Sequence, residues 1–208
     1  MDPTVKKWFK SIGLTEANNH KTNYNNDFIE QHGNIKSVKK EAGFDPVQVQ
    51  EKMNFFMMQS LVIEVGTEQM RKYFLKQTGI DKSNVGQFLM QEQHARLKNI
   101  KIVADQKQIM YRKDANIKKF DITIMMILIR YCCGVSRPDK FWTNPGQQDN
   151  TNLANLVRIQ KYRNMMIAHN PDLRIPVVEF ENYWKILTPI FKNLGVTVDE
   201  INKYRQIV

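Results

Sequence analysis

Apolar residues at helical spacing dominate the chain from Asp45 onward. Asp45 and Pro46 supply a helix N-cap and a proline suited to the first helical turn. The apolar positions that follow are Phe55, Phe56, Met58, Leu61, Val62, Val65, Met70, Tyr73 and Phe74. This pattern ends near Gly79 and predicts one long helix over residues 45–79.

A second helix is expected to begin after Ser83 and to run towards Met110. Its apolar positions are Phe88, Leu89, Leu97, Ile100 and Val103. The charged stretch that follows, residues 111–119, is expected to be a connection.

The segment after Asp121 is apolar nearly all round and closes at Gly134. Such a segment is typical of a helix in the middle of a bundle, with Asp121 as its N-cap. A loop with two prolines is expected over residues 135–150. Thr151 then caps a helix that reaches His169, and the pair Asn170-Pro171 ends that helix.

The C-terminal region predicts one long helix and one short one. The long helix covers Val177 to Asn193 and ends at Gly195, with inward positions Phe180, Trp184, Leu187 and Phe191. The residues Thr197 to Glu200 form a capping box for the short helix. No alternating Val/Ile/Thr pattern supports a sheet, so we predict an all-α, antiparallel bundle of about five main helices.

Residues 1–44 differ from the rest in being mostly polar, with five asparagines between Asn18 and Gln31. Near the start, Trp8, Phe9 and Ile12 favour a short amphipathic helix. We therefore divide the chain into a polar N-terminal arm, residues 1–44, and a helical domain, residues 45–208.

Composition narrows the class of protein. Apolar residues make up 42% of the 208 positions, which is typical of a globular chain. No apolar run is long enough to span a membrane, and the first residues lack the apolar core of a secretion signal. Cys132 and Cys133 are adjacent and are expected to be reduced thiols. These features predict an intracellular, cytoplasmic protein, with the nucleus as the alternative, and no membrane partner.

The formal charge is +10, from 31 Lys+Arg against 21 Asp+Glu. Such a balance favours partners that carry phosphates, RNA among them. The alternative explanation is a lysine-rich solvated surface, and the charge alone does not decide between the two. The four histidines show no ligand spacing with the cysteines, so we expect no metal site and no cofactor.

The segment 152–171 carries the candidate chemistry. On a helical projection its apolar arc holds Leu153, Leu156, Ile159, Met166 and Ile167. Arg163 falls in the middle of this arc, and Asn164 lies at its edge. A guanidinium on a packing face is costly unless it is paired or meets an anion. Arg163, Asn164 and His169 are therefore the candidate catalytic residues.

His169 lies six residues after Arg163. An ideal helix would place it roughly 120° round and about 9 Å further along the axis. The two side chains can meet one phosphate only if Arg163 reaches along the helix, the helix end distorts, or a second copy contributes. A structural alternative has Arg163 paired to a buried acid such as Asp121, and His169 acting as a C-cap.

This helix resembles the signature of HEPN domains, in which an arginine followed by a polar residue precedes a histidine. Further blocks resemble the branch found in DAZ-interacting zinc-finger ubiquitin ligases. These blocks are Val65–Arg71, Phe120–Ile124, Ile129–Gly134, the loop with Pro138, Trp142 and Pro145, Asn155–Gln160, and Phe180, Glu181 and Trp184. The likeness spans residues 50 to about 195.

The resemblance implies a helical bundle that dimerises through the motif helix, and a metal-independent ribonuclease chemistry. By that likeness His169 would act on the 2′-hydroxyl or the leaving oxygen, Arg163 would stabilise charge on the phosphorane, and Asn164 would orient the cleft. Arg130, Arg158 and Lys161 are the candidate substrate-binding residues along the same cleft.

Two hypotheses follow. The first is an RNA-directed HEPN domain, in its catalytic form an endoribonuclease acting at a dimer cleft. The second is a non-catalytic interaction or scaffold subunit of a larger assembly, which the eleven methionines favour because methionine-rich faces adapt to partners.

Overall fold

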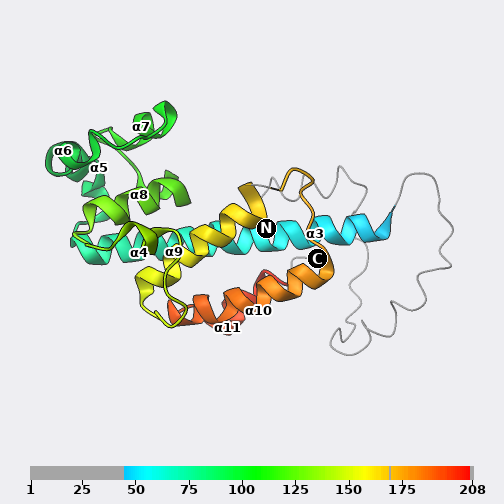
Figure 1. The fold of residues 1–208 in the computed structure, drawn as a ribbon. Helices are drawn as coiled ribbons and strands as arrows, with labels where there is room; N and C mark the ends of the chain where they lie inside the picture. The colour runs from blue at the N-terminus through cyan, green and yellow to red at the C-terminus, as the bar shows by residue number, and fades with distance from the viewer. Residues whose placement is uncertain (1–44, 169, 207–208) are drawn as a thin grey trace. The chain divides into compact units, whose positions relative to one another are not determined.

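The fold is described from a computed structural model, which covers residues 45–168 and 170–206. The predicted short helix around Trp8, Phe9 and Ile12 lies outside these described residues. Residues 45–208 belong to one compact unit. Across the described ranges the regular structure is helical and no strand occurs, which confirms the all-α fold class (Figure 1).

The first helical stretch consists of α3 (Pro46–Ser60), the π-helical segment η2 (Leu61–Gly66) and α4 (Thr67–Thr78). Asp45 caps α3 by accepting the N–H of Val47 at 3.0 Å. Gly79 ends α4 in the left-handed region, at φ 69°, which a residue without a β-carbon adopts at little cost. The predicted long helix is confirmed, with one π-helical interruption.

The predicted helix from Ser83 to Met110 is wrong. The chain instead forms η3 (Lys82–Asn84), α5 (Val85–Gln87), η4 (Phe88–Glu92), α6 (His94–Leu97) and α7 (Ala104–Met110). Between the buried Leu89 and Leu97 the main hydrophobic side chain is Met90, which is 45% exposed. A continuous helix would have had no apolar face to pack there. We call residues 82–119 the lobe.

The interruption of the expected helix also changes which side chains of the lobe face the core. Ile102 is buried, whereas Val103, which was expected to face inward, is 66% exposed. The lobe ends with the short segment η5 (Ile117–Lys119), which leads into the central helix.

The central helix is α8 (Ile122–Cys132), and Asp121 caps it by accepting the N–H of Ile124 at 2.8 Å. Seven of its eleven residues are buried, as the nearly continuous apolar pattern predicted. It packs mainly against α4. Gly134 follows at φ 66°, so the expected helix and its end are both confirmed.

The last part of the chain forms η6 (Asp139–Trp142), α9 (Asn152–Arg163), the π-helical segment η7 (Asn164–Ala168), α10 (Val177–Asn193) and α11 (Val198–Lys203). Thr151 caps α9 through Ala154 at 3.3 Å, and Thr197 caps α11 through Glu200 at 3.2 Å. These caps and the bounds of α10 confirm the expected elements.

Helix α9 packs against η2 and α10, and α10 also packs against α3. In Figure 1 α9, α10 and α3 run alongside one another, while α5, α6 and α7 gather beside α8. The four predicted inward residues of α10 are buried: Phe180, Trp184, Leu187 and Phe191. In the described part of the chain, no helix is long and apolar enough to cross a membrane.

Candidate functional site

The apolar face of α9 is directed into the bundle. Leu153, Leu156, Ile159 and Met166 are each at most 4% exposed, in agreement with the helical projection. The side chain of Ile167 lies outside the described set. Arg163 follows Ile159 by one turn, so the fold places a guanidinium at the edge of the core.

Arg163 is half-buried and has few partners. Its Nη1 donates to Oδ1 of Asn164 at 3.1 Å. Its Nε is buried and has no hydrogen-bond partner among the described residues. A buried donor without an acceptor costs about 1 to 3 kcal/mol, and Nε of Arg174 shares this property with Nε of Arg163.

The structural alternative, in which Arg163 pairs with Asp121, does not occur. Asp121 uses its carboxylate to cap α8, as described above. Among the described residues no carboxylate forms an ion pair with Arg163. The guanidinium therefore keeps donors that an anion could use.

The helix changes geometry at the motif. Asn164 is the first residue of the π-helical segment η7, in which hydrogen bonds span five residues instead of four. Such segments are frequent at functional sites. The angle and distance expected between Arg163 and His169 assumed an ideal α-helix. His169 itself lies outside the described residues, so its meeting with Arg163 stays a prediction.

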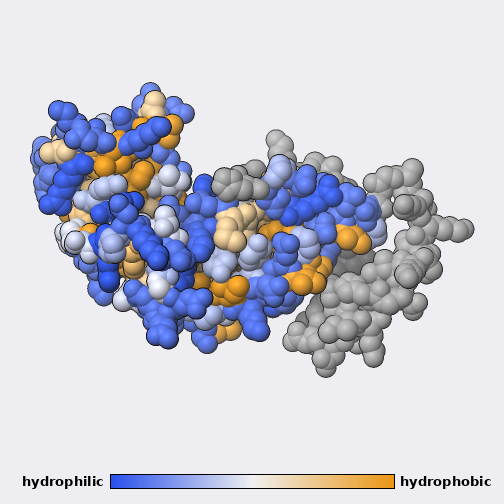
Figure 2. Space-filling view, viewed as in Figure 1, coloured by the Kyte–Doolittle hydropathy of each residue, from blue (hydrophilic) through white to orange (hydrophobic). Residues whose placement is uncertain are grey.

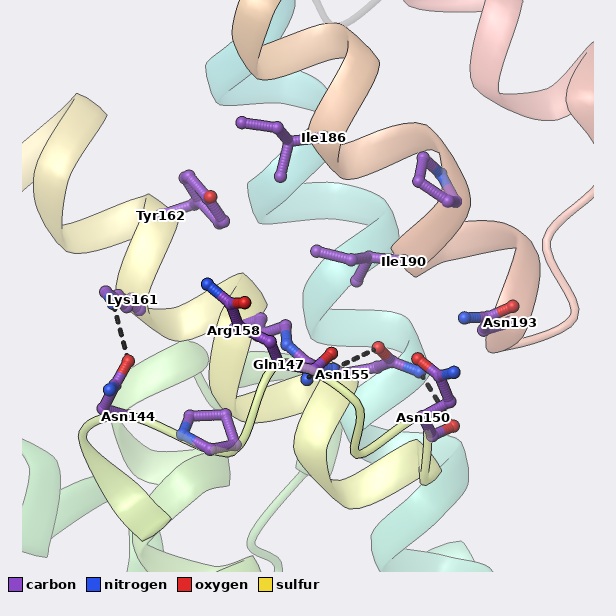
Figure 3. Close-up of a pocket in the computed structure, with 12 residues that line it drawn as sticks. Asn144, Gln147, Asn150, Asn155, Arg158, Lys161, Tyr162, Ile186, Ile190 and Asn193 are labelled. Atoms are coloured by element: carbon purple, nitrogen blue, oxygen red, sulfur yellow. Dashed lines mark hydrogen bonds between the residues drawn. The ribbon is translucent and has the colours of Figure 1, made fainter. Parts of the chain in front are cut away.

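A pocket of about 390 Å³ opens between α9, α10 and the loop 144–150. Its lining residues are Asn144, Pro145, Gln147, Asn150, Asn155, Arg158, Lys161, Tyr162, Ile186, Pro189, Ile190 and Asn193. Figure 3 shows Ile186 and Ile190 on the α10 side and Asn144 on the loop side. The described lining contains two cations and no carboxylate, so the pocket suits an anionic or carbonyl-rich ligand.

Two of the three predicted substrate-binding residues, Arg158 and Lys161, line this pocket, and Arg163 does not. Arg158 donates to Oδ1 of Asn155 at 2.9 Å and to the carbonyl of Gly146 at 2.6 Å. Lys161 donates to Oδ1 of Asn144 at 3.1 Å. Arg158 thus mainly holds the loop in place, while the exposed Lys161 keeps further donors for a ligand.

The third predicted residue, Arg130, lies elsewhere. Its Nη2 donates to Oδ1 of Asp139 at 2.5 Å. Its guanidinium also lies 5.3 Å from the ring centroid of Tyr131 and 5.4 Å from that of Trp142. Arg130 is not among the residues that line this pocket, and its role in substrate binding stays a prediction.

Sequence reasoning missed the carboxamide side chains of the pocket. Asn155 is buried, and its Nδ2 donates to the carbonyl of Asn150 at 3.3 Å. The spacing of Asn155 and Arg158, three residues apart on a helix, is a signal that could have predicted their contact.

The two cysteines lack the lowered pKa that is typical of a reactive thiol. Burial raises the pKa of both thiols, Cys132 and Cys133, to about 12. Both therefore stay protonated at neutral pH, and the thiolate is the reactive form. In the described part of the chain no three His, Cys, Asp or Glu side chains gather in a way that could hold a metal ion.

Comparison with known proteins shows that this chain is a HEPN domain protein. The family model described as DZIP3/hRUL138-like HEPN matches residues 82–207, and the chain belongs to this family. This match confirms the resemblance that the sequence blocks indicated.

Two curated relatives are the E3 ubiquitin-protein ligases DZIP3 of Mus musculus and of Homo sapiens. Each is 26% identical to this chain over 90 residues, which is 43% of this chain and 8% of the ligase. The chain thus matches only a small part of either ligase. No solved structure matches this chain.

Proposed function

We propose that this chain is an RNA-directed HEPN domain in which Arg163 contacts a backbone phosphate. The observation that carries the proposal is the half-buried guanidinium whose Nε has no acceptor among the described residues. A guanidinium presents five donors in a fixed fork that matches phosphate oxygens. A bound phosphate would supply the missing acceptor and would compensate the cost of the buried donor.

Further support comes from the pocket on the same helix. Lys161 and Arg158 face a cavity without carboxylates. The phosphates of single-stranded RNA bind to surfaces with positive charge. With Arg163, Arg158 and Lys161 on one helix, α9 would therefore offer contacts for more than one nucleotide.

In its catalytic form the proposal is a metal-independent endoribonuclease at a dimer cleft. The 2′-oxygen would attack the phosphorus and the bond to the 5′-oxygen would break, which yields a 2′,3′-cyclic phosphate and a 5′-hydroxyl. His169 would accept the proton of the 2′-hydroxyl or donate one to the leaving oxygen. Arg163 would stabilise the charge of the phosphorane, and Asn164, its hydrogen-bond partner, would hold the guanidinium in place.

The binding test uses fluorescence anisotropy with a labelled, unstructured oligouridylate of about 20 nucleotides in EDTA. Arg163→Gln should weaken binding about tenfold or more, because one fully engaged charged contact is lost. Lys72→Gln removes one exposed charge on α4 and should change the affinity less than about twofold. Equal losses in the two variants would contradict a specific role of Arg163.

Stability provides an independent measurement. Arg163→Met removes the buried Nε donor that has no partner among the described residues. It places an apolar side chain of similar length on the apolar face of α9. We expect the free energy of unfolding to stay constant or to rise by about 1 kcal/mol while RNA binding is lost. A strongly destabilised Met variant would indicate a structural arginine.

The catalytic form is tested separately by cleavage of the same RNA in EDTA. His169→Ala should abolish cleavage and leave the circular dichroism spectrum unchanged. If this variant cleaves RNA as fast as the wild type, the cleavage comes from a contaminant and the proposed catalytic role of His169 is wrong.

A second candidate function is a non-catalytic interaction or scaffold subunit. One observation favours it: Met165, in the motif segment η7, is 48% exposed, and an exposed methionine suits a protein contact. A dimer that is stable to dilution, inert towards RNA and insensitive to His169→Ala would support this function. Sedimentation velocity of Met165→Glu tests whether η7 lies in that interface.

A further inference from the structure

Most of the chain's net charge lies in the lobe. Residues 82–119 contain three carboxylates, Glu92, Asp105 and Asp114, so that the lobe alone carries +6 of the total of +10. Its nine cations are Lys82, Arg96, Lys98, Lys101, Lys107, Arg112, Lys113, Lys118 and Lys119. The excess of positive charge is thus a local property of 38 residues and not an even feature of the surface.

These cations are available to a partner. All nine are exposed. Of these nine cations, only Arg112 forms an ion pair with a described residue, with Asp114 at 3.0 Å. Figure 2 shows hydrophilic residues around α6 and α7, with a group of hydrophobic residues between them. A cluster of cations that outnumber the carboxylates among them produces a positive potential that attracts polyanions.

The fold concentrates the cations instead of spreading them along one helix. A β-carbon on Gly86 would lie 2.3 Å from the carbonyl oxygen of Arg112 and 2.5 Å from that of Lys113. Glycine therefore allows α5 to pack directly on the turn after α7, and the two ends of the lobe come together. The helix expected from Ser83 to Met110 would have been about 40 Å long.

The end of the lobe is also fixed to the bundle. Arg71 of α4 donates to the carbonyls of Ile117, Lys118 and Phe120, each at 3.0 Å. The cations of residues 112–119 are therefore held on an anchored backbone, and less conformational entropy is lost when a ligand binds.

The lobe also offers side chains that suit bases. The exposed His94 packs edge-on against the half-buried Tyr111, with ring centroids 5.6 Å apart. Positive charge together with accessible rings is the combination that binds single-stranded nucleic acid with little sequence preference.

We propose that the lobe is a second RNA-binding surface, which holds the strand by its phosphates independently of Arg163. The choice of RNA rests on the proposed function, since the charge alone would also suit an acidic protein. Binding at the lobe would raise the local concentration of RNA near the motif helix.

The test neutralises four lysines in the lobe: Lys98, Lys101, Lys107 and Lys113, each changed to Gln. The matched control neutralises four exposed lysines outside it: Lys72, Lys76, Lys185 and Lys192. Both variants lose the same charge, so that a general effect of net charge affects them equally. A third variant changes the four lobe lysines to Arg and keeps the charge.

Binding of the labelled oligouridylate is measured over a range of salt concentrations. Each phosphate contact contributes about −0.7 to the slope of log K against log salt for a single strand. We expect the Gln variant of the lobe to lose tenfold or more in affinity, with a slope shallower by about 2 to 3. The control should lose less than about threefold, and the Arg variant should bind like the wild type.

The outcomes separate this inference from the proposed function. Equal losses in the lobe variant and the control, or no loss in the lobe variant, would overturn the inference while Arg163→Gln still tests the motif. A wild-type protein that binds no RNA would overturn the proposed function and this inference with it. If such a protein bound polyglutamate through the lobe lysines, the partner would be an acidic protein.

Discussion

Gly66 of η2 lies directly against Ile159 of α9. A β-carbon on Gly66 would be 2.8 Å from Cγ2 of Ile159, well inside normal contact distance. Ile159 is fully buried and β-branched, so it has little freedom to move aside. Arg163 follows Ile159 by one turn, so this close contact lies next to the motif arginine on α9.

Gly66→Ala tests that contact. Steric overlap should cost about 1 to 3 kcal/mol, and the better helix propensity of alanine should return about 1 kcal/mol. We expect net destabilisation of about 1 kcal/mol in urea denaturation, together with weaker RNA binding.

A double-mutant cycle supplies the control. Ile159→Ala removes Cγ2, so that Gly66→Ala in this background should stabilise the protein instead of destabilising it. The same destabilisation in both backgrounds would show that Ile159 is not the obstacle.

Arg71→Gln tests how the end of the lobe is held. The side chain of Arg71 is only 18% exposed, and it donates to three backbone carbonyls. Loss of these charged donors should lower the free energy of unfolding by about 2 to 4 kcal/mol. Hydrogen exchange should become faster in residues 82–119 more than in α9 or α10.

Glu68→Gln is the matched control for Arg71. It removes the ion pair between Glu68 and Arg71 at 3.3 Å but leaves the three carbonyl contacts. Since Glu68 is 44% exposed, the cost should be below about 1 kcal/mol. A cost equal to that of Arg71→Gln would place the stabilisation in the ion pair.

Alkaline pH should destabilise the fold through Tyr204. Burial first, and then the charge of Glu64, raise the pKa of Tyr204 from 10.0 to about 12. The Tyr204 hydroxyl donates to Oε2 of Glu64 at 3.1 Å. Between pH 10 and 12 the native state keeps a proton that the unfolded chain has lost, so stability falls as the pH rises.

The measurement is urea denaturation at several pH values between 9 and 12. This range lies between the ordinary pKa values of Tyr204, Cys132 and Cys133 and their raised values of about 12. Tyr204→Phe should show a shallower decline than the wild type, because the tyrosine contribution is gone. The thiols of Cys132 and Cys133, whose pKa is also raised, should still produce some decline in both proteins. Identical curves would show that Tyr204 does not carry this dependence.

The sequence predicted those elements whose ends have local chemical signals. Asp121, Thr151 and Thr197 each cap the helix that was expected to follow them. These contacts join residues three positions apart, so the pattern of the chain is sufficient to predict them.

The lobe could not be predicted in the same way. The close approach of Gly86 to the carbonyls of Arg112 and Lys113 joins residues more than twenty positions apart. The contact of Arg71 with the carbonyl of Ile117 spans 46 positions. Local propensity contains no information about such contacts, and a continuous helix was the natural expectation for residues 83–110.

For the candidate site, the projection predicted the half-buried position of Arg163 but not the geometry of the helix around it. The π-helical segment that begins at Asn164 has no marker in the residues themselves. The bonds of Arg158 with the carbonyls of Gly146 and Gln147 also depend on the fold of a distant loop.

Residues 82–119 leave the bundle after α4 and return to it at carbonyls held by Arg71 of the same helix. Both ends of the segment are thus attached to α4. The segment also supplies buried side chains to the hydrophobic core, Val85, Leu89, Leu97 and Met110 among them. Substitutions that alter what the domain recognises are therefore tolerated best at the exposed positions of the lobe, while its buried positions keep their side chains.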